Sequence, residues 1–424
     1  MNATTPSHFD ALETRPQAQR EAALMAALPA QLIHAKAHAP AFASGLADVD
    51  AATVNSRAAL ARLPVVRKHE LLERQRHADA PDVFGGFSAL GWGATLPERR
   101  ALRVFASPGP IYEPEGGTAD YWRMARALFA AGLRAGDLVH NSFSYHFTPA
   151  GAMMESGAFA LGCTVFPGGT GQTEQQVQAM AALKPAAYIG TPSFLKIILE
   201  KADELGIALP SLAKASVGGE AFPPSLRDWM QARGIAAYQS YGTADLGLIA
   251  YETESREGLV IDEGVIVEIV RPGTGDVLAD GEVGEVVVTT LNRGYPLLRF
   301  GTGDLSAVLP GQCPTGRTNA RIRGWMGRAD QTAKVRGMFV HPAQVAEIVR
   351  RFPEVRKARL VVRGEMANDS MELRVEADGA PEGLAERLAS VVREVTKLRG
   401  EVLLCTVGTL PNDGKVIEDA RNYA

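Results

Sequence analysis

The feature that most constrains the fold is an alternation of strand-like and helix-like runs through the middle of the chain. These runs follow one another at 138–143, 150–161, 164–167, from Thr173 onward, 187–190 and 193–205. Such alternation is typical of βα units, in which helices cover both faces of a largely parallel sheet. We therefore expect an α/β core, and a chain of 424 residues has room for a second, smaller domain.

The segments on either side of this core differ in character. Residues 8–80 are polar and alanine-rich with helical spacing, which predicts a helical lead-in. Residues 259–290 alternate apolar and polar positions around glycine-containing turns, which predicts added antiparallel strands. The residues after Asp330 have strand-like and helix-like runs of their own, which predicts a compact α+β domain. The predicted divisions are 1–80, 81–329 and 330–424.

The start of the helix at Thr173 carries a capping signal. Thr173 is followed three residues later by Gln176, and the glycine-rich segment 168–171 precedes it. In a capping box the threonine hydroxyl accepts a hydrogen bond from the third backbone N–H, and the glutamine reaches back to the cap. We expect this pair to begin the helix after a tight turn.

Charge and cysteine content exclude several classes of protein. Lysine and arginine number 44 against 48 acidic residues, with no long basic run, so we expect no nucleic-acid partner. The beginning of the sequence lacks the pattern of a secretory signal, and no apolar stretch is long enough for a membrane helix. Cys163, Cys313 and Cys405 are scattered, which argues against a disulfide framework and a CxxC metal site. We expect a cytoplasmic protein without a membrane partner.

Residues 299–304, RFGTGD, form the first candidate nucleotide-binding cluster. A carboxylate at a strand end beside glycines can accept hydrogen bonds from both hydroxyls of a ribose. The alternative is a turn in which Asp304 bonds its own backbone. Neither GxxxxGK[ST] nor a strand-associated GxGxxG occurs, so any ATP is bound without a Walker loop.

Residues 239–245, QSYGTAD, form a second candidate cluster after a strand-like run. Tyr241 can stack on an adenine, Gly242 lets the backbone approach a ligand, and Asp245 can bind Mg²⁺ through oxygen. The alternative places Tyr241 in the core and Asp245 at a helix cap.

Two further clusters lie near the end of the chain. Residues 327–337, GRADQTAKVRG, include Arg328 and fall at the expected domain boundary, where Asp330 can act as a hinge; the alternative is a hairpin with solvated basic residues. Residues 411–415, PNDGK, end in Lys415, whose ammonium can stabilise charge at a transferring phosphoryl group. The alternative for Lys415 is a solvated surface lysine.

The order of these clusters resembles the phenylacetate-CoA ligase family of the acyl-adenylate-forming superfamily. The resemblance covers residues 60–424 and includes the segments 141–151, 161–167, 184–185, 191–193 and 218–220. It implies a large domain, a mobile C-terminal lid, and an ATP-dependent, AMP-forming ligation of a carboxylic acid to coenzyme A. The implied cofactors are ATP, Mg²⁺ and CoA, the implied partner is a small carboxylic acid, and a homodimer is left open.

The resemblance also assigns roles to positions of this chain. Lys415 would serve adenylation, Asp245 would support Mg²⁺, and Asp330 would be the hinge. The nucleotide would contact Gly218, Gly219, Glu220, Tyr241, Gly242, Thr243, Asp304 and Arg328. Arg336 and Gly337 would line the passage for CoA, and the acyl pocket would include Tyr145, His146 and Phe147.

One segment departs from the family pattern. Where the family carries a Ser/Thr/Gly-rich loop with a lysine, this chain has FASPGPIYEPEG at 105–116. Its prolines remove backbone donors, and Glu113 and Glu115 are expected to repel a triphosphate. Asp245 also stands where a glutamate is usual. The alternatives to a ligase are therefore a binding protein that has lost adenylation, and an enzyme that passes its acyl group to another acceptor.

The choice of acid is predicted from aromatic residues alone. Aromatic side chains at Phe143, Tyr145, Phe147, Phe166 and Tyr188 favour an aryl or other apolar acid. Core packing explains the same residues equally well.

Overall fold

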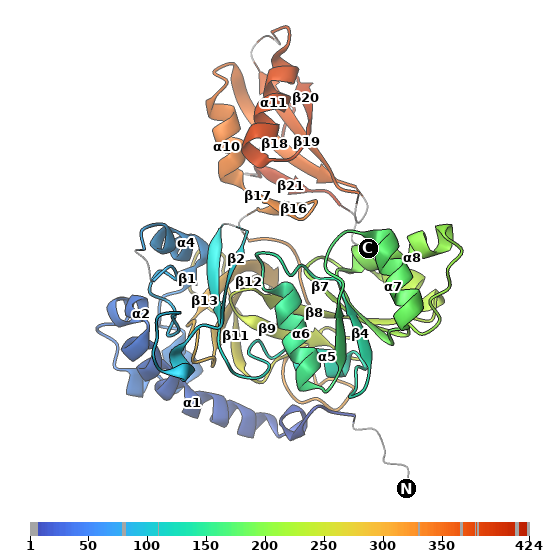
Figure 1. Ribbon diagram of the computed structural model, residues 1–424. Coiled ribbons are helices and arrows are strands. Elements are labelled where there is room, and N and C mark those ends of the chain that lie inside the picture. The colour runs from blue at the N-terminus through green and yellow to red at the C-terminus, as the bar shows by residue number, and fades with distance from the viewer. Residues whose placement is uncertain are drawn as a thin grey trace. The chain divides into compact units, whose positions relative to one another are not determined.

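The computed structural model describes residues 7–78, 82–108, 110–329, 331–364, 368–377, 379, 381–411 and 415–421. Contacts divide the chain into two compact units, Met1–Met326 and Gly327–Ala424, and Figure 1 labels the elements of both. No helix among the described residues combines the length and apolar character needed to cross a membrane.

The first unit is built on a mixed sheet to which nine strands of its described residues contribute. In spatial order these are β14 (Val308–Leu309), β15 (Arg321–Ile322), β10 (Leu259–Ile261), β9 (Gly247–Glu252), β8 (Ala236–Thr243), β7 (Lys214–Gly218), β6 (Ala187–Gly190), β4 (Leu138–Asn141) and β5 (Thr164–Pro167). From β5 to β8 neighbouring strands are parallel, and β9 and β10 continue the sheet antiparallel. The predicted α/β core is confirmed.

Helices connect the parallel strands, as the alternation predicts. The helices described in the first unit are α1 (Gln17–His38), α2 (Pro40–Gly45), α3 (Arg57–Leu60), α4 (Lys68–Arg76), α5 (Met124–Ala130), α6 (Ala150–Ala160), α7 (Thr173–Leu183), α8 (Pro192–Glu204) and α9 (Pro224–Ala232), with 3₁₀ turns η1 (Ala11–Thr14), η2 (Ala51–Thr53) and η3 (Pro97–Arg99). Figure 1 shows α5 and α6 side by side over the large sheet, and α7 beside α8. Burial of apolar helix faces against the sheet supplies the main stabilisation of such a layer.

The capping box predicted at α7 is wrong. The residue before the helix, Gln172, has a left-handed backbone with φ of 51° and makes no side-chain cap. The Gln176 amide instead donates to the carbonyls of Gly169 at 2.9 Å and Gly171 at 2.7 Å, and its Oε1 accepts from His140 at 2.6 Å. Gln176 therefore holds the glycine loop rather than the helix end.

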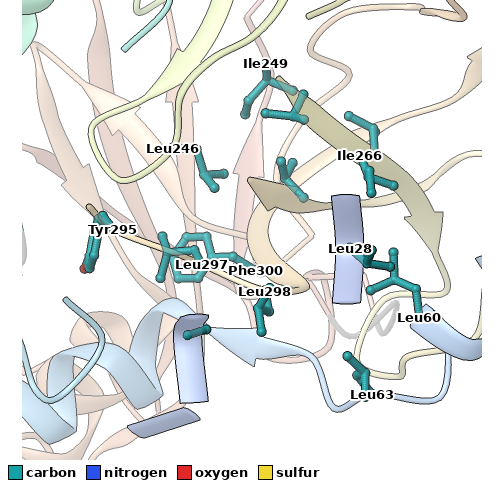
Figure 2. Packing of buried hydrophobic residues seen from close by; sticks show 14 of the residues in the cluster. Leu28, Leu60, Leu63, Leu246, Ile249, Ile266, Tyr295, Leu297, Leu298 and Phe300 are labelled. Atoms are coloured by element: carbon teal, nitrogen blue, oxygen red, sulfur yellow. The ribbon is translucent and has the colours of Figure 1, made fainter. Parts of the chain in front are cut away.

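A smaller sheet packs against the helical lead-in. In the described residues it has the order β1 (Val66–Arg67), β13 (Phe300–Ser306), β12 (Gly284–Thr290) and β11 (Val265–Val270). β11, β12 and β13 are antiparallel neighbours, which confirms the strands predicted after residue 259, whereas β1 joins β13 in parallel. Figure 2 shows how Leu28 of α1 and Leu60 of α3 gather with Ile266 and Phe300 in one buried cluster. The lead-in thus shares the core of the first unit.

A buried ion network attaches the start of the chain to the large sheet. The carboxylate of Glu13 lies 3.2 Å from Arg126 and 3.0 Å from Arg317, and it accepts a hydrogen bond from Tyr251 of β9 at 2.9 Å. All four side chains are buried. Since a buried carboxylate is stable only when its charge is compensated, these partners keep the segment before α1 in place.

The second unit is an α+β fold with its own core. In its described part a sheet of order β20 (Glu401–Cys405), β19 (Ser370–Ala377), β18 (Val355–Arg363) and β21 (Ile417–Asp419) is accompanied by α10 (Pro342–Arg350), α11 (Leu384–Thr396) and the hairpin β16 (Ala333–Val335) and β17 (Met338–Val340). Leu360 and Leu373 of the sheet pack with Leu388 of α11 in a cluster drawn entirely from this unit. The elements match the runs expected after Asp330, which itself lies outside the described residues.

Candidate active site

The carboxyl ends of parallel strands are where the first cluster of predicted residues gathers. Gly218 ends β7, and Gly219 and Glu220 follow it in the loop to α9. The Glu220 carboxylate accepts a 2.7 Å hydrogen bond from the backbone N–H of Ser193, in the first turn of α8. A carboxylate is stabilised at a helix N-terminus, so this contact fixes the loop beside the sheet edge where ligands of α/β folds bind.

Asp304 is held by two aromatic side chains. Tyr241 of β8 donates from its hydroxyl to Asp304 Oδ2 at 2.9 Å, and Trp325 donates from its indole nitrogen to Oδ1 at 3.1 Å. Asp304 belongs to β13, so the contact joins the smaller sheet to the larger one. The residue is only 9% exposed. Hydrogen bonds from two sides orient the carboxylate, as recognition of a diol requires.

Sequence reasoning did not find Trp325. The residue follows β15 and precedes the end of the first unit, in a segment without strand or helix periodicity. The one available signal is that Trp325 is among only four tryptophans in the chain and stands directly before the cluster at 327–337.

Gly242 and Thr243 shape the turn between β8 and β9. The ladder shifts register between Tyr241 and Gly242, and a Cβ on Gly242 would lie 2.6 Å from the carbonyl oxygen of Gly247. Thr243 Oγ1 accepts a hydrogen bond from the Leu246 backbone N–H at 3.1 Å. Gly242 is therefore required by the backbone here, and its contact with a nucleotide stays a prediction.

The expected metal role of Asp245 does not fit its surroundings. Lys68 Nζ lies 2.9 Å from Asp245 Oδ2, and the aspartate side chain is 0% exposed. Mg²⁺ needs a nearly octahedral set of oxygen ligands, and an ammonium paired with the same carboxylate repels a second cation there. Among the described residues, moreover, no group of three or more His, Cys, Asp or Glu side chains could hold a metal ion.

The segment expected to repel a triphosphate is a hairpin of β2 (Arg103–Ser107) and β3 (Ile111–Glu115). Glu113 is fully buried, and burial first, then the Asp245 carboxylate, raises its pKa well above the ordinary value. The Ser107 hydroxyl donates to its Oε1. Burial also raises the pKa of Glu115, whose Oε2 lies 2.6 Å from Arg103 Nε. The expected repulsion is wrong, because neither group presents an uncompensated charge to a ligand.

Glu113→Gln is expected to remove a pH-dependent loss of stability. Because the folded pKa is raised, stability is highest below the ordinary value of 4.5 and falls as the pH rises through the folded pKa. Glutamine stays neutral at every pH. As the pH rises from 5 to 8, the free energy of unfolding of Glu113→Gln should therefore increase by about 1–3 kcal/mol relative to that of the wild type. Urea unfolding at both pH values measures this. The exposed control Glu282→Gln should show the same change in stability with pH as the wild type. The same result for Glu113→Gln would contradict a raised pKa of Glu113.

The predicted acyl-pocket residues divide between two hollows of the first unit. Tyr145 and His146 line a cavity of about 500 Å³ with Phe166, Gln175 and Gln176. Phe147 lies in a separate hollow beside the β2–β3 hairpin and is 81% exposed. Its backbone has a left-handed φ of 60°. The structure thus places Phe147 in a different hollow from Tyr145 and His146, and the role of all three in binding the acid stays a prediction.

Two hydrogen bonds to its hydroxyl fix the ring of Tyr145. Its hydroxyl accepts from Asn141 Nδ2 at 2.8 Å and donates to Glu155 Oε2 at 2.9 Å. Burial raises its pKa, so the phenol remains a neutral donor. The cavity thus has one rigid aromatic wall.

The remaining predicted residues belong to the second unit. The Arg328 guanidinium lies 5.9 Å from the centre of the Phe339 ring. Arg336 and Gly337 form the turn between β16 and β17, with φ of 47° and 82°, and the Arg336 N–H donates to Asp369 Oδ2 at 3.1 Å. Lys415 is exposed just before β21. The roles of these residues in nucleotide and CoA binding stay predictions.

The known proteins that this chain resembles in sequence and structure include several CoA ligases. The family model described as AMP-binding enzyme matches residues 118–295. Phenylacetate-coenzyme A ligase from Aromatoleum evansii is 32% identical over 368 residues, covering 83% of this chain and 80% of that protein. The enzyme of the same name from Thermus thermophilus is 31% identical over 388 residues, covering 83% and 84%. A solved structure of 2-hydroxyisobutyryl-CoA ligase in complex with 2-HIB-AMP and CoA matches with a TM-score of 0.82 and 25% identity, over 100% of this chain and 95% of that one.

Proposed function

This chain belongs to the phenylacetate-coenzyme A ligase family, and from that premise we propose how its residues carry out the reaction. It is an ATP-dependent, AMP-forming acid–CoA ligase that works through an acyl-adenylate. In the first half, a carboxylate oxygen of the acid bonds to the α-phosphorus of ATP and the bond to pyrophosphate breaks. In the second, the CoA sulfur bonds to the acyl carbon, the bond to AMP breaks, and the thiol proton passes to solvent.

Asp304 carries the proposal for nucleotide binding. Its carboxylate is oriented by Tyr241 at 2.9 Å and Trp325 at 3.1 Å, at a position suited to the two ribose hydroxyls. Gly218 ends β7, the strand beside β8, and Gly219 and Glu220 follow it. These three residues would frame the adenine. Binding energy from the nucleoside holds the α-phosphorus in place for attack, which is a large part of catalysis in such transfers.

We assign the stabilisation of negative charge on the transferring phosphoryl group to residues of the second unit. Lys415 would neutralise it as a flexible point charge, with Arg328 contacting ribose or phosphate. Arg336 and Gly337 would border the path of the pantetheine arm, and Asp330 would be the hinge. Mg²⁺ is part of the ATP substrate here, and no ligand from this chain is assigned to it.

The cavity beside Tyr145 supports an aryl acid as substrate. Tyr145 and Phe166 provide aromatic surface, and His146 and Gln175 provide polar groups at the same cavity. A rigid aromatic wall with a few polar groups is typical of small-molecule pockets. The family disfavours the alternative of a binding protein without adenylation. A cytoplasmic location and a possible homodimer stay predictions.

The test is acid-dependent release of pyrophosphate by the full chain. Purified protein is incubated with ATP, magnesium and a panel of aryl and short apolar acids, and CoA is then added while mass spectrometry follows the thioester. We expect pyrophosphate with at least one aryl acid and the matching acyl-CoA after CoA addition. Pyrophosphate without a thioester would indicate another acceptor, and binding of ATP without pyrophosphate for any acid would refute the proposal.

A further inference from the structure

Three elements far apart in the sequence bring a lysine and two acidic residues together inside the first unit. Lys68 begins α4, Glu113 lies on β3, and Asp245 lies in the turn between β8 and β9. Lys68 Nζ is 2.9 Å from Asp245 Oδ2, and Glu113 lies within electrostatic reach of both. The Asp245 side chain is 0% exposed and that of Lys68 is 35% exposed, so the lysine lies between the buried carboxylate and the surface.

Hydrogen bonds and a strand pairing hold this arrangement in addition to the ion pair between Lys68 and Asp245. Gln75, two turns further along α4, donates from Nε2 to the carbonyl of Tyr112 at 2.9 Å and accepts from the Tyr112 N–H at 2.8 Å. These two hydrogen bonds attach the helix to the β2–β3 hairpin. On the other side, β1, which directly precedes Lys68, pairs with β13 at Val66 and Phe300. The lysine stem therefore starts from a backbone fixed on both sides.

We propose that the Lys68 ammonium occupies the cation position at Asp245, so that Asp245 binds no divalent metal in this protein and instead positions Lys68. A buried carboxylate requires a compensating positive charge, and the ammonium supplies it. A divalent ion at the same oxygens would be repelled by the positive charge of the ammonium. The proposal shares its site with the proposed ligase function but does not depend on turnover.

The position of Lys68 also bears on the part of the hairpin that follows Arg103. Residues 104–116 contain no lysine or arginine. Lys68 of α4 pairs with Asp245, and its charge also acts on the buried carboxyl group of Glu113 on β3. A negatively charged phosphate chain passing this edge meets an ammonium rather than a carboxylate, which electrostatics favours.

The test uses Mn²⁺ alone as a probe on the nucleotide-free full chain, with electron paramagnetic resonance reading the free ion. We expect wild type and Asp245→Asn to bind the same small amount of Mn²⁺. Lys68→Met, which keeps the stem and removes the charge, should gain a Mn²⁺ site at least about tenfold tighter than any in the wild type, a difference of about 1.4 kcal/mol. The double variant Lys68→Met/Asp245→Asn should lose that site, and Lys68→Arg should not gain it.

Two results would overturn the proposal. The first is a Mn²⁺ site in the wild type that Asp245→Asn removes, since Asp245 would then be a metal ligand. The second is a Lys68→Met variant that folds, as thermal melting shows, and gains no Mn²⁺ site. If Asp245→Asn does not fold, a wild-type dissociation constant for Mn²⁺ below about 0.1 mM would itself count against the proposal, and a weaker one would support it. None of these readings changes if the chain proves to have no ligase activity.

Discussion

Lys415→Ala is expected to lower acid-dependent pyrophosphate release by about 10²- to 10³-fold while ATP affinity stays within a factor of about three. The ammonium acts on charge that develops in the transition state, so its removal should reduce kcat rather than ground-state binding. Lys415 is exposed, and its replacement leaves the core of the second unit intact. Pyrophosphate release in a coupled assay and calorimetric titration with ATP measure the two quantities.

Lys397→Ala is the matched control for this prediction. Lys397 is also exposed, belongs to the same unit and carries the same charge, at the C-terminal end of α11. Its replacement should leave pyrophosphate release unchanged. Equal rates in Lys415→Ala and wild type would exclude Lys415 from adenylation, whereas equal losses in both lysine variants would assign the effect to the net charge of the unit.

Local patterns predicted the elements of the first unit closely. The expected strands at 164–167 and 187–190 are β5 and β6, because short runs with β-branched and aromatic residues between turn residues favour strands. The capping box at Thr173 failed for a physical reason: Gln176 found better partners in two carbonyls and His140 than in the helix end. Such competition depends on tertiary contacts, which the spacing of residues in the sequence does not reveal.

The candidate site shows the same limit more sharply. Asp304 and Tyr241 were chosen from separate motifs, and their direct hydrogen bond arises only when the two sheets meet. Lys68 was not singled out, because its partner Asp245 lies far away in the sequence and a lysine opening a polar helix is ordinary. For Glu113, the sequence indicated a repelling charge, whereas burial changes the protonation that a carboxyl favours. Contacts between residues far apart in the sequence decide the electrostatics, so sequence reasoning could find Glu113 and Asp245 but neither the partner Lys68 nor the protonation that burial favours.

Asp304→Ala is expected to weaken the binding of ATP and AMP alike, by about 10²- to 10⁴-fold. A hydrogen bond to a charged group contributes about 1.5–3 kcal/mol, and a carboxylate that accepts both ribose hydroxyls makes two of them. Since the contact is to the ribose, the loss should not depend on the β- and γ-phosphates. Calorimetric titration of the variant with each nucleotide measures it.

Two further variants separate a binding role of Asp304 from a structural one. Tyr241→Phe removes the 2.9 Å hydrogen bond that orients the carboxylate and keeps the ring, so nucleotide affinity should fall by about tenfold, less than in Asp304→Ala. Asp280→Ala, at an exposed position of the same unit, should bind as the wild type does. If Asp304→Ala keeps its affinity for both nucleotides, the carboxylate serves only to tie Tyr241 and Trp325 to β13, and the ribose must be held by other residues of the same sheet edge.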